Sequence, residues 1–339
     1  MRHLLNTLYI TTQETSLSKE RECVKIKQGG RTIAMIPAHT LNGLVIFGHV
    51  STTPFLLAFC AEKGICVSWL TEQGRFLAAF HGPVSGNVLL RRRQYRLADD
   101  QAASAAIARA MLRGKIHNCR TVLRRAAREN PDGALDAASE RLGCCLAQLT
   151  GNLSLDQARG QEGEAAGIYF GVFGRLISNG EPEFTFSGRN RRPPLDAVNA
   201  LLSFYYTLLT HEIRGALEAV GLDPAVGFLH RDRPGRPSLA LDLMEEFRPY
   251  IADRLALTII NRRQMTFQDF QVLENGAVFL NDQGRKKAIA AWQARKKEGI
   301  EHPFLKEKIP VGLLWHIQAG LLARHLRGDL AAYPAFGVR

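Results

Sequence analysis

A histidine and several carboxylates that could bind a metal ion lie close together in the segment GFLHRDRPGRPSLALDLMEEFRP (227–249). The prolines and the glycine after His230 interrupt any helix, so His230 ends one element and Ser238 is expected to cap the next. Asp242 and Glu245 stand three residues apart and therefore share a face of that second helix. An imidazole with two carboxylates, in a chain without a Cys-x-x-Cys pair, suits Mg²⁺ or Mn²⁺ better than structural zinc. The alternative is that the acids only stabilise a helix start.

A third acidic candidate lies in the helix expected over 155–176. Glu162 and Glu164 are two residues apart, which places them on nearly opposite helix faces, so only one of them can face inward. Gly163 between them allows another backbone or a substrate to approach closely. Both glutamates could equally be solvent-exposed helix charges, and the pattern of residues leaves this choice open.

The composition indicates a globular protein with an anionic partner. The chain has 339 residues, a 46% hydrophobic content and a formal net charge of +12, with an isoelectric point near 9.7. Most of the excess is arginine, which pairs well with phosphate, so a nucleic acid is the expected partner. The six cysteines show no metal-binding spacing, and no signal segment is evident, so we expect reduced thiols in a cytoplasmic protein. No apolar run reaches the roughly 18 residues of a membrane span, so no membrane partner is expected.

Eight arginines are candidates for DNA binding. They fall in three groups: a run that begins the helical part, a pair in the next long helical segment, and a group in the loop before a Pro-Pro pair. Each group could follow a phosphate backbone or could form an ordinary solvated face, and both interpretations stay open. The eight residues are Arg91, Arg92, Arg93, Arg124, Arg125, Arg189, Arg191 and Arg192.

Two regions of different character must position these residues. Residues 1–85 contain short β-branched runs, with a hairpin expected at a Gly-Gly turn and one helix over 53–62. From 96 to 339, alanine, leucine and arginine dominate and helical patterns follow one another, with 86–95 as a linker. We therefore expect an α+β protein with a small N-terminal β-rich domain and a larger all-α catalytic domain. Strand edges in the first domain favour a homodimer built on it.

Three motifs occur in order at compatible spacing along the chain. They are GQEGEAAGIYF, RRPPLDAVNALLSFYYTLL and GFLHRDRPGRPSLALDLMEEFRP, which begin at residues 160, 191 and 227. Together they resemble the CRISPR-associated spacer-acquisition integrase, the "Cas one" family. LNTLYITT near the start and VSGNVLLRRRQYR at the junction also resemble that family, and the former is similar to its type I-C branch. The resemblance covers essentially the whole chain.

This resemblance implies a site and a set of partners. The family's metal-binding glutamate and histidine correspond to Glu162 and His230, and its acidic position corresponds to Glu245, where many members have aspartate. Asp242 is then either a further ligand or a residue that supports one. The resemblance also implies Mg²⁺ or Mn²⁺ as cofactor, a homodimer formed through the β-rich domains, a small second Cas protein ("Cas two") and, for the type I-C branch, a Cas four nuclease.

The implied activity is that of a metal-dependent DNA endonuclease and integrase. It would insert double-stranded spacer DNA into a CRISPR repeat by attack of a 3′-hydroxyl on a repeat phosphodiester. Such a transesterification needs no covalent enzyme intermediate, which agrees with the lack of a Ser or Cys nucleophile constellation. Two alternatives remain. One is a non-catalytic architectural nucleic-acid-binding subunit, and the other is a metallohydrolase of small substrates, against which the dispersed arginines argue.

Overall fold

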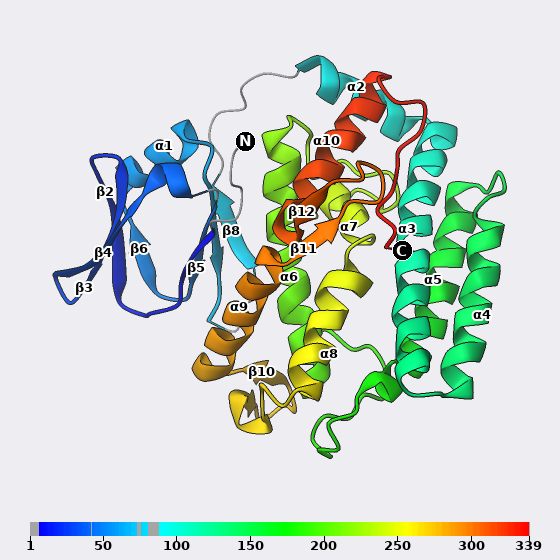
Figure 1. The fold of residues 1–339 in the computed structure, drawn as a ribbon. Helices are drawn as coiled ribbons and strands as arrows, with labels where there is room; N and C mark the ends of the chain where they lie inside the picture. Colours follow the sequence, from blue (N-terminus) through cyan, green and yellow to red (C-terminus); the bar gives the residue numbers. More distant parts are fainter. Residues whose placement is uncertain (1–6, 42, 73–75, 81–87, 339) are drawn as a thin grey trace.

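The computed structural model describes residues 7–41, 43–72, 76–80 and 88–338. Figure 1 shows a strand-rich N-terminal region on one side of the molecule and a larger, mainly helical region on the other. The mixed α and β class predicted from the sequence is therefore confirmed. The N-terminal elements are β1 (Thr7–Ile10), β2 (Thr15–Glu20), β3 (Cys23–Gln28), β4 (Arg31–Pro37), β5 (Gly43–Phe47), β6 (Val50–Thr52), α1 (Pro54–Glu62), β7 (Cys66–Leu70) and β8 (Phe76–Phe80).

The strands form two sheets of four, in the orders β4-β3-β2-β6 and β1-β5-β7-β8. The predicted hairpin joins β3 and β4, which pair antiparallel. Its turn uses Gly29 and Gly30, with φ of 56° and 79°, a region that glycine enters without steric cost. The predicted helix over 53–62 is also present as α1, and the Thr53 side chain accepts a hydrogen bond from the amide of Leu56.

Strand β5 joins the two regions, because both of its faces are buried. Leu44 and Ile46 pack into the core between the two sheets. Val45 and Phe47, which point the other way in a strand, pack into the core of the helical region. The sheet β1-β5-β7-β8 therefore serves as a platform on which the helices rest.

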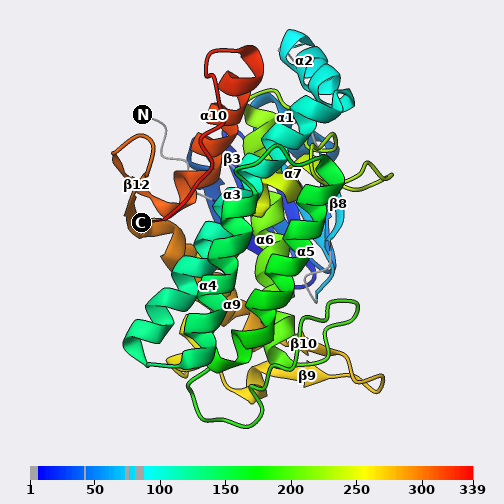
Figure 2. The same ribbon diagram turned by 90° about the vertical axis from the view of Figure 1, so that its right-hand side faces the viewer.

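The helical region surrounds a central helix, α6 (Ala197–Ala219). Figure 2 shows α3, α4 and α5 running side by side, and α6 is buried along most of its length. No helix in the described ranges is long and apolar enough to cross a membrane. The helices are α2 (Val88–Asp99), α3 (Gln101–Glu129), α4 (Gly133–Gln148), α5 (Leu155–Val172), α6 (Ala197–Ala219), α7 (Ser238–Met244), α8 (Arg254–Asn261), α9 (Asp282–Lys297) and α10 (Leu314–Arg327).

The second region is not all-α as predicted. It contains two short hairpins, β9 (Phe270–Val272) with β10 (Val278–Leu280) and β11 (Gly299–Glu301) with β12 (Lys308–Pro310). The first hairpin turns at an Asn-Gly pair in which Gly276 has a φ of 78°, a short-range turn signal that the helical reading overlooked.

The linker predicted over 86–95 overlaps the start of a helix. The chain is already helical from Val88, where α2 begins. The run VLLRRRQYRLAD has no glycine or proline and is rich in leucine and arginine, which are good helix formers. Residues 86 and 87, and the predicted domain boundary at residue 85, lie outside the described residues.

The segment that carries Glu245 differs from the expected single helix over SLALDLMEEF. Helix α7 ends at Met244, and Glu245 occupies its C-cap. A π-helical turn over Arg248–Asp253 then leads into α8. Ser238 does not cap α7, because its hydroxyl donates to the carbonyl of Arg231 at 3.3 Å. This irregular passage places Glu245 where the chain changes direction, inside the helical layer.

Candidate active site

Asp242 organises the loop that ends at His230. Its carboxylate is completely buried and accepts backbone amides of Phe228 at 2.6 Å, Leu229 at 2.9 Å and His230 at 3.0 Å. The loop can approach so closely because residue 227 is glycine: a Cβ there would lie 2.6 Å from Oδ2 of Asp242. The chain thus reverses between His230 and the next helix and brings the imidazole beside Asp242.

The same carboxylate fixes the imidazole. Nδ1 of His230 lies 2.6 Å from Oδ1 of Asp242, and Nε2 has no hydrogen-bond partner among the described residues, so it can face a ligand. A carboxylate on the other ring nitrogen is the usual way in which proteins orient a metal-binding histidine. Because three amides and an imidazole already occupy Asp242, the geometry favours a supporting role for it over that of a direct ligand.

Glu162 and Glu245 meet at a lysine that the sequence interpretation did not include. Lys115 on α3 is only 5% exposed. Its Nζ forms an ion pair with Oε1 of Glu162 on α5 and lies 2.7 Å from Oε2 of Glu245. The second oxygen of Glu245 pairs with Nη1 of Arg248 at 2.9 Å. Two carboxylates and two cations thus form one compact cluster between α3, α5 and the end of α7.

The electrostatics of this cluster favour charged groups. Burial by itself would raise the pKa of Glu245, but Arg248 and Lys115 outweigh it and lower that pKa, and His230 adds to the effect. Burial likewise acts to lower the pKa of Lys115, but the charges of Glu245 and Glu162 raise it above its ordinary value. Glu245 is therefore ionised and Lys115 protonated at neutral pH.

As the side chains stand, no three His, Cys, Asp or Glu groups within the described ranges converge on a single metal position. The Lys115 ammonium lies between Glu162 and Glu245, where a shared cation would have to sit. The donor set itself has the right chemistry for Mg²⁺ or Mn²⁺, with two carboxylates and a free imidazole nitrogen. The residue types present therefore suit a divalent ion, and its binding at this cluster stays a prediction.

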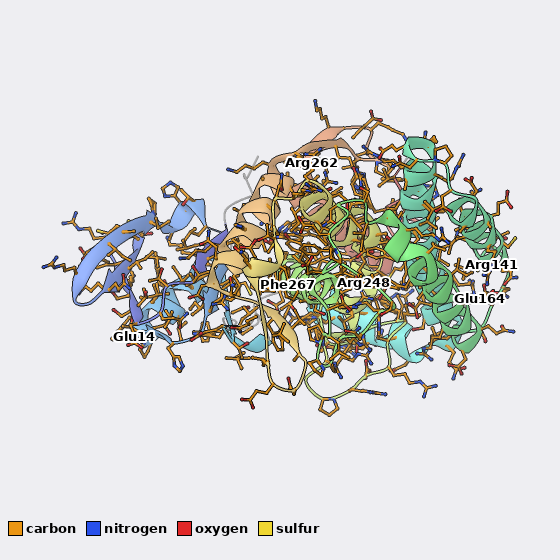
Figure 3. The ribbon with its side chains drawn as sticks, turned by 90° about the horizontal axis from the view of Figure 1, so that it is seen from below. Glu14, Arg141, Glu164, Arg248, Arg262 and Phe267 are labelled. Atoms are coloured by element: carbon orange, nitrogen blue, oxygen red, sulfur yellow. The ribbon has the colours of Figure 1, made fainter. Side chains whose placement is uncertain are left out.

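Arg248 is held firmly in place. Its guanidinium lies over the ring of Tyr206, 4.8 Å from the centroid, and Figure 3 shows Arg248 within the helical layer. The hydroxyl of Tyr206 donates to Asp253 at 2.6 Å. A second guanidinium, that of Arg189, also lies near the Tyr206 ring, 5.3 Å from its centroid.

Arg189 was predicted to bind DNA, but its guanidinium is engaged within the protein. It donates to Oδ1 of Asn199 at 2.6 Å and to the hydroxyl of Ser203 at 3.1 Å. These contacts tie the loop before α6 to that helix. Arg189 therefore has a structural part in holding this loop, and its contact with DNA stays a prediction.

The other predicted DNA-binding arginines are more accessible. Arg91 is half-buried on α2, and Arg125 is exposed but pairs with Glu129 at 2.9 Å. The remaining five are exposed, on α2, on α3 and in the loop before α6; they are Arg92, Arg93, Arg124, Arg191 and Arg192. Their contact with DNA stays a prediction.

Two glutamates that neighbour the candidate ligands in sequence, Glu164 and Glu246, lie in different surroundings. Glu164 is exposed, and Figure 3 shows it at the outer rim of the helical region. Glu246 is instead completely buried. Its carboxylate accepts the amide of Phe336 at 2.6 Å and the hydroxyl of Tyr333 at 2.8 Å. It is thus an anchor for the C-terminal segment, which no local pattern near residue 246 reveals.

One sequence signal could have identified Lys115. It occupies a position in the apolar stripe of α3, in register with Leu112, Cys119 and Val122, all of which are buried. A lysine at such a position must find an anionic partner, because an unpaired buried charge is very costly. The stripe therefore predicts an acid opposite residue 115, although it cannot say which one.

The fold is shared with solved structures of other proteins. The structure of TM1797, a CAS1 protein from Thermotoga maritima, has a TM-score of 0.83 at 22% identity, covering 95% of this chain and 97% of that one. A casposase bound to its integration product has a TM-score of 0.84 at 24% identity, covering 98% and 94%. A Cas6-RT-Cas1–Cas2 complex contains a chain with a TM-score of 0.84, of which 36% is covered. These likenesses define the fold.

The sequence itself defines the family. The family model for "CRISPR associated protein Cas1" matches residues 8–294, and the chain belongs to the Cas1 family. It is 56% identical to the CRISPR-associated endonuclease Cas1 1 of Chlorobaculum tepidum, over 99% of both chains, and 51% identical to Cas1 2 of Rhodospirillum rubrum, over 98% of both. A Geobacter sulfurreducens Cas4/Cas1 fusion is 39% identical, covering 98% of this chain and 60% of the fusion.

Proposed function

We propose that this protein is a metal-dependent DNA endonuclease and integrase that inserts spacer DNA into a CRISPR array. Membership of the Cas1 family supports the nuclease and integrase role in spacer acquisition. The observation that carries the catalytic assignment is the meeting of Glu162 and Glu245 at one buried cation position, with His230 oriented by Asp242.

Each residue would have a distinct part in the reaction. Glu162, Glu245 and Nε2 of His230 would hold Mg²⁺ or Mn²⁺. When bound, the ion supplies a Lewis acid for the attacked phosphodiester and its leaving 3′ oxygen. Arg248, fixed by Tyr206 and Glu245, keeps the buried carboxylate ionised and oriented. Asp242 would hold the imidazole in one orientation. The attacking group would be the 3′-hydroxyl of the DNA, so the protein would position the reacting groups and supply no nucleophile of its own.

The partners follow from the relatives and from the surface. The Cas4/Cas1 fusion and the Cas1–Cas2 complex support assembly with a small Cas2 protein and a Cas4 nuclease. We also propose type I-C as the branch, because the N-terminal motif LNTLYITT is similar to it. The DNA partners would be a double-stranded spacer precursor with 3′ ends and the CRISPR repeat.

A homodimer through the β-rich region is part of the proposal. Strand β4 is at the edge of its sheet and exposes Ile33 by 53% and Met35 by 43%. An unpaired edge with apolar side chains favours pairing with a second chain. Light scattering at micromolar concentration should give the dimer mass, and Ile33→Lys with Met35→Lys should give a monomer. A wild-type monomer at that concentration would contradict this part of the proposal.

The central test is strand transfer. A short duplex with 3′-hydroxyl ends is incubated with supercoiled plasmid and Mn²⁺, and joined products are measured. We expect Glu162→Ala, His230→Ala and Glu245→Ala each to abolish joining while DNA affinity persists. Glu164→Ala is the matched control, because that carboxylate is exposed on the opposite face of the same helix. It should remain active.

The architectural alternative rests on one observation: Glu162 and Glu245 are already neutralised by Lys115 and Arg248. If the wild-type protein binds DNA but joins no strands in Mn²⁺, this alternative is correct. Joining by Glu162→Ala at the wild-type rate would remove Glu162 from the site.

A further inference from the structure

Lys115 occupies the position that the proposed metal ion would need. Its ammonium lies between Glu162 and Glu245, and within the described ranges no ready-made site of three ligands forms around them. Any part that this lysine plays in metal binding rests on the proposed metal-dependent function.

The charges of the cluster balance without a metal ion. Glu162 and Glu245 contribute two negative charges, and Lys115 and Arg248 contribute two positive ones. The nearby Asp242 is engaged by three amides and the imidazole. An incoming dication is therefore attracted weakly while the ammonium stays between the two carboxylates. Metal binding and the Lys115 ion pairs compete for the same oxygens.

Of the two cations, only Lys115 is suited to move. Arg248 is held by Glu245 and by the ring of Tyr206, whereas lysine carries a compact charge on a flexible four-carbon stem. The contact between Nζ and Oε2 of Glu245 is short, at 2.7 Å, and the same ammonium also pairs with Glu162. One compact group therefore neutralises both carboxylates, and its stem can carry it away from both together.

We propose that Lys115 is an internal substitute for the metal ion. In the metal-free protein its ammonium holds Glu162 and Glu245 together and prevents their repulsion. When Mn²⁺ or Mg²⁺ binds, the ammonium leaves the space between them. Lys115 is therefore a positioning residue, which acts through the two carboxylates and sets how tightly the divalent ion binds.

The test measures Mn²⁺ affinity by calorimetry, together with thermal unfolding in chelator. Lys115→Met removes the charge and keeps a similar volume, so Mn²⁺ should bind about tenfold tighter or more, because the buried Glu245 and the half-buried Glu162 have lost their shared cation. The same variant should unfold at a lower temperature without metal and gain more from added Mn²⁺. Mn²⁺ affinity equal to or weaker than wild type would overturn the inference.

A second variant decides the matter if Lys115→Met does not fold. Lys115→Arg keeps the charge and places a planar fork against the carboxylates, which strengthens the competitor. Mn²⁺ should then bind about tenfold weaker than in wild type, and unchanged or tighter binding would overturn the inference.

Lys296→Met is the matched control. Lys296 is another buried lysine, paired with Glu212 away from this cluster. Its loss should lower the unfolding temperature and leave Mn²⁺ affinity unchanged.

The same titrations separate this inference from the proposed function. Wild-type Mn²⁺ binding that is absent, or that Glu162→Ala does not weaken, would overturn the metal centre and the role of Lys115 with it. Binding that depends on Glu162, combined with unchanged affinity in both Lys115 variants, would overturn the role of Lys115 alone.

Discussion

Nδ1 of His230 lies 2.6 Å from Oδ1 of Asp242, and the same carboxylate also accepts the backbone amide of His230 at 3.0 Å. Residue 242 therefore fixes both the main chain and the ring of residue 230. This double contact places the imidazole relative to Glu245, which lies only three residues further along the chain. The orientation of one proposed ligand thus depends on a residue that need not touch the metal ion.

Asp242→Asn tests this dependence. The amide keeps the shape but turns an acceptor into a donor, so one of the buried donors around it loses its partner. We expect Mn²⁺ affinity and strand transfer to fall about 10–100-fold, and the free energy of unfolding to fall by about 1–3 kcal/mol. Calorimetry with Mn²⁺ and urea unfolding measure the two effects. Wild-type Mn²⁺ affinity in Asp242→Asn would show that His230 does not need this orientation.

Glu246 should make stability depend on pH. Burial raises its pKa from the ordinary 4.5 to about 8, although the amide of Phe336 and the hydroxyl of Tyr333 act in the opposite sense. The folded protein therefore holds a proton that the unfolded chain has already released between these two values. The free energy of stabilisation that protonated Glu246 contributes is fully present below pH 4.5 and is lost as the pH rises through about 8.

The variant Glu246→Gln isolates this effect because it cannot titrate. Between pH 5.5 and 7.5, wild-type stability should fall relative to the variant by as much as about 1.4 kcal/mol per pH unit. Urea unfolding of both proteins at the two pH values gives this difference directly. Parallel pH profiles would mean that Glu246 is ionised in the folded protein across this range.

The parts of the fold that could be predicted are those determined by local sequence. The Gly29-Gly30 hairpin and α1 depend on turn and capping residues within a few positions. The predicted helix over 155–176 is present as α5 followed by a short 3₁₀ turn. Its start is also local, since Ser154 and Gln157 form a reciprocal capping box.

The parts that could not be predicted depend on distant residues. Glu246 is buried because Phe336, ninety positions away in the chain, donates to it, and Glu162 meets Lys115 across 47 positions. Spacing along the chain indicates which residues share a helix face but not what packs against that face. The sequence therefore indicated Glu162, His230 and Glu245 as candidates, whose catalytic part stays a prediction, but it did not indicate that Lys115 lies between the two acids.

A buried ion pair anchors the strand-rich region to the helices. Lys296 on α9 pairs with Glu212 on α6, and both are buried. The hydroxyl of Tyr9 on β1 donates to the same carboxylate at 3.2 Å. Burial acts to raise the pKa of Glu212, but the charge of Lys296 and its hydrogen bond outweigh burial and lower that pKa. Lys296 is thus the main group that keeps this carboxylate charged.

Lys296→Met should therefore destabilise the protein by about 3–5 kcal/mol, because it leaves a buried carboxylate without its partner. Replacing both residues, as Lys296→Met with Glu212→Leu, should recover much of that loss, since an apolar pair of similar volume can substitute for a buried ion pair. Chemical unfolding monitored by tryptophan fluorescence measures both variants. A double variant as unstable as the single one would show that the pair is needed for more than charge balance.

The exposed arginines of α2 should bind phosphates. Arg92 and Arg93 are exposed, whereas Arg189, from the same predicted set, is engaged by Asn199 and Ser203. If both exposed residues contact the DNA backbone, Arg92→Ala with Arg93→Ala should weaken binding for all sequences. The slope of log K against log salt concentration should also decrease in magnitude by about 2, because two fewer counterions are released.

Fluorescence anisotropy at several salt concentrations measures this slope. The control, Lys27→Ala with Arg31→Ala, removes the same charge from the hairpin of β3 and β4, which Figure 1 shows at the far side of the strand-rich region. Its salt slope should match that of the wild type, so the comparison separates local phosphate contacts from the effect of net charge. Equal changes in both variants would mean that the overall charge of +12, and not a particular surface of α2, attracts the DNA.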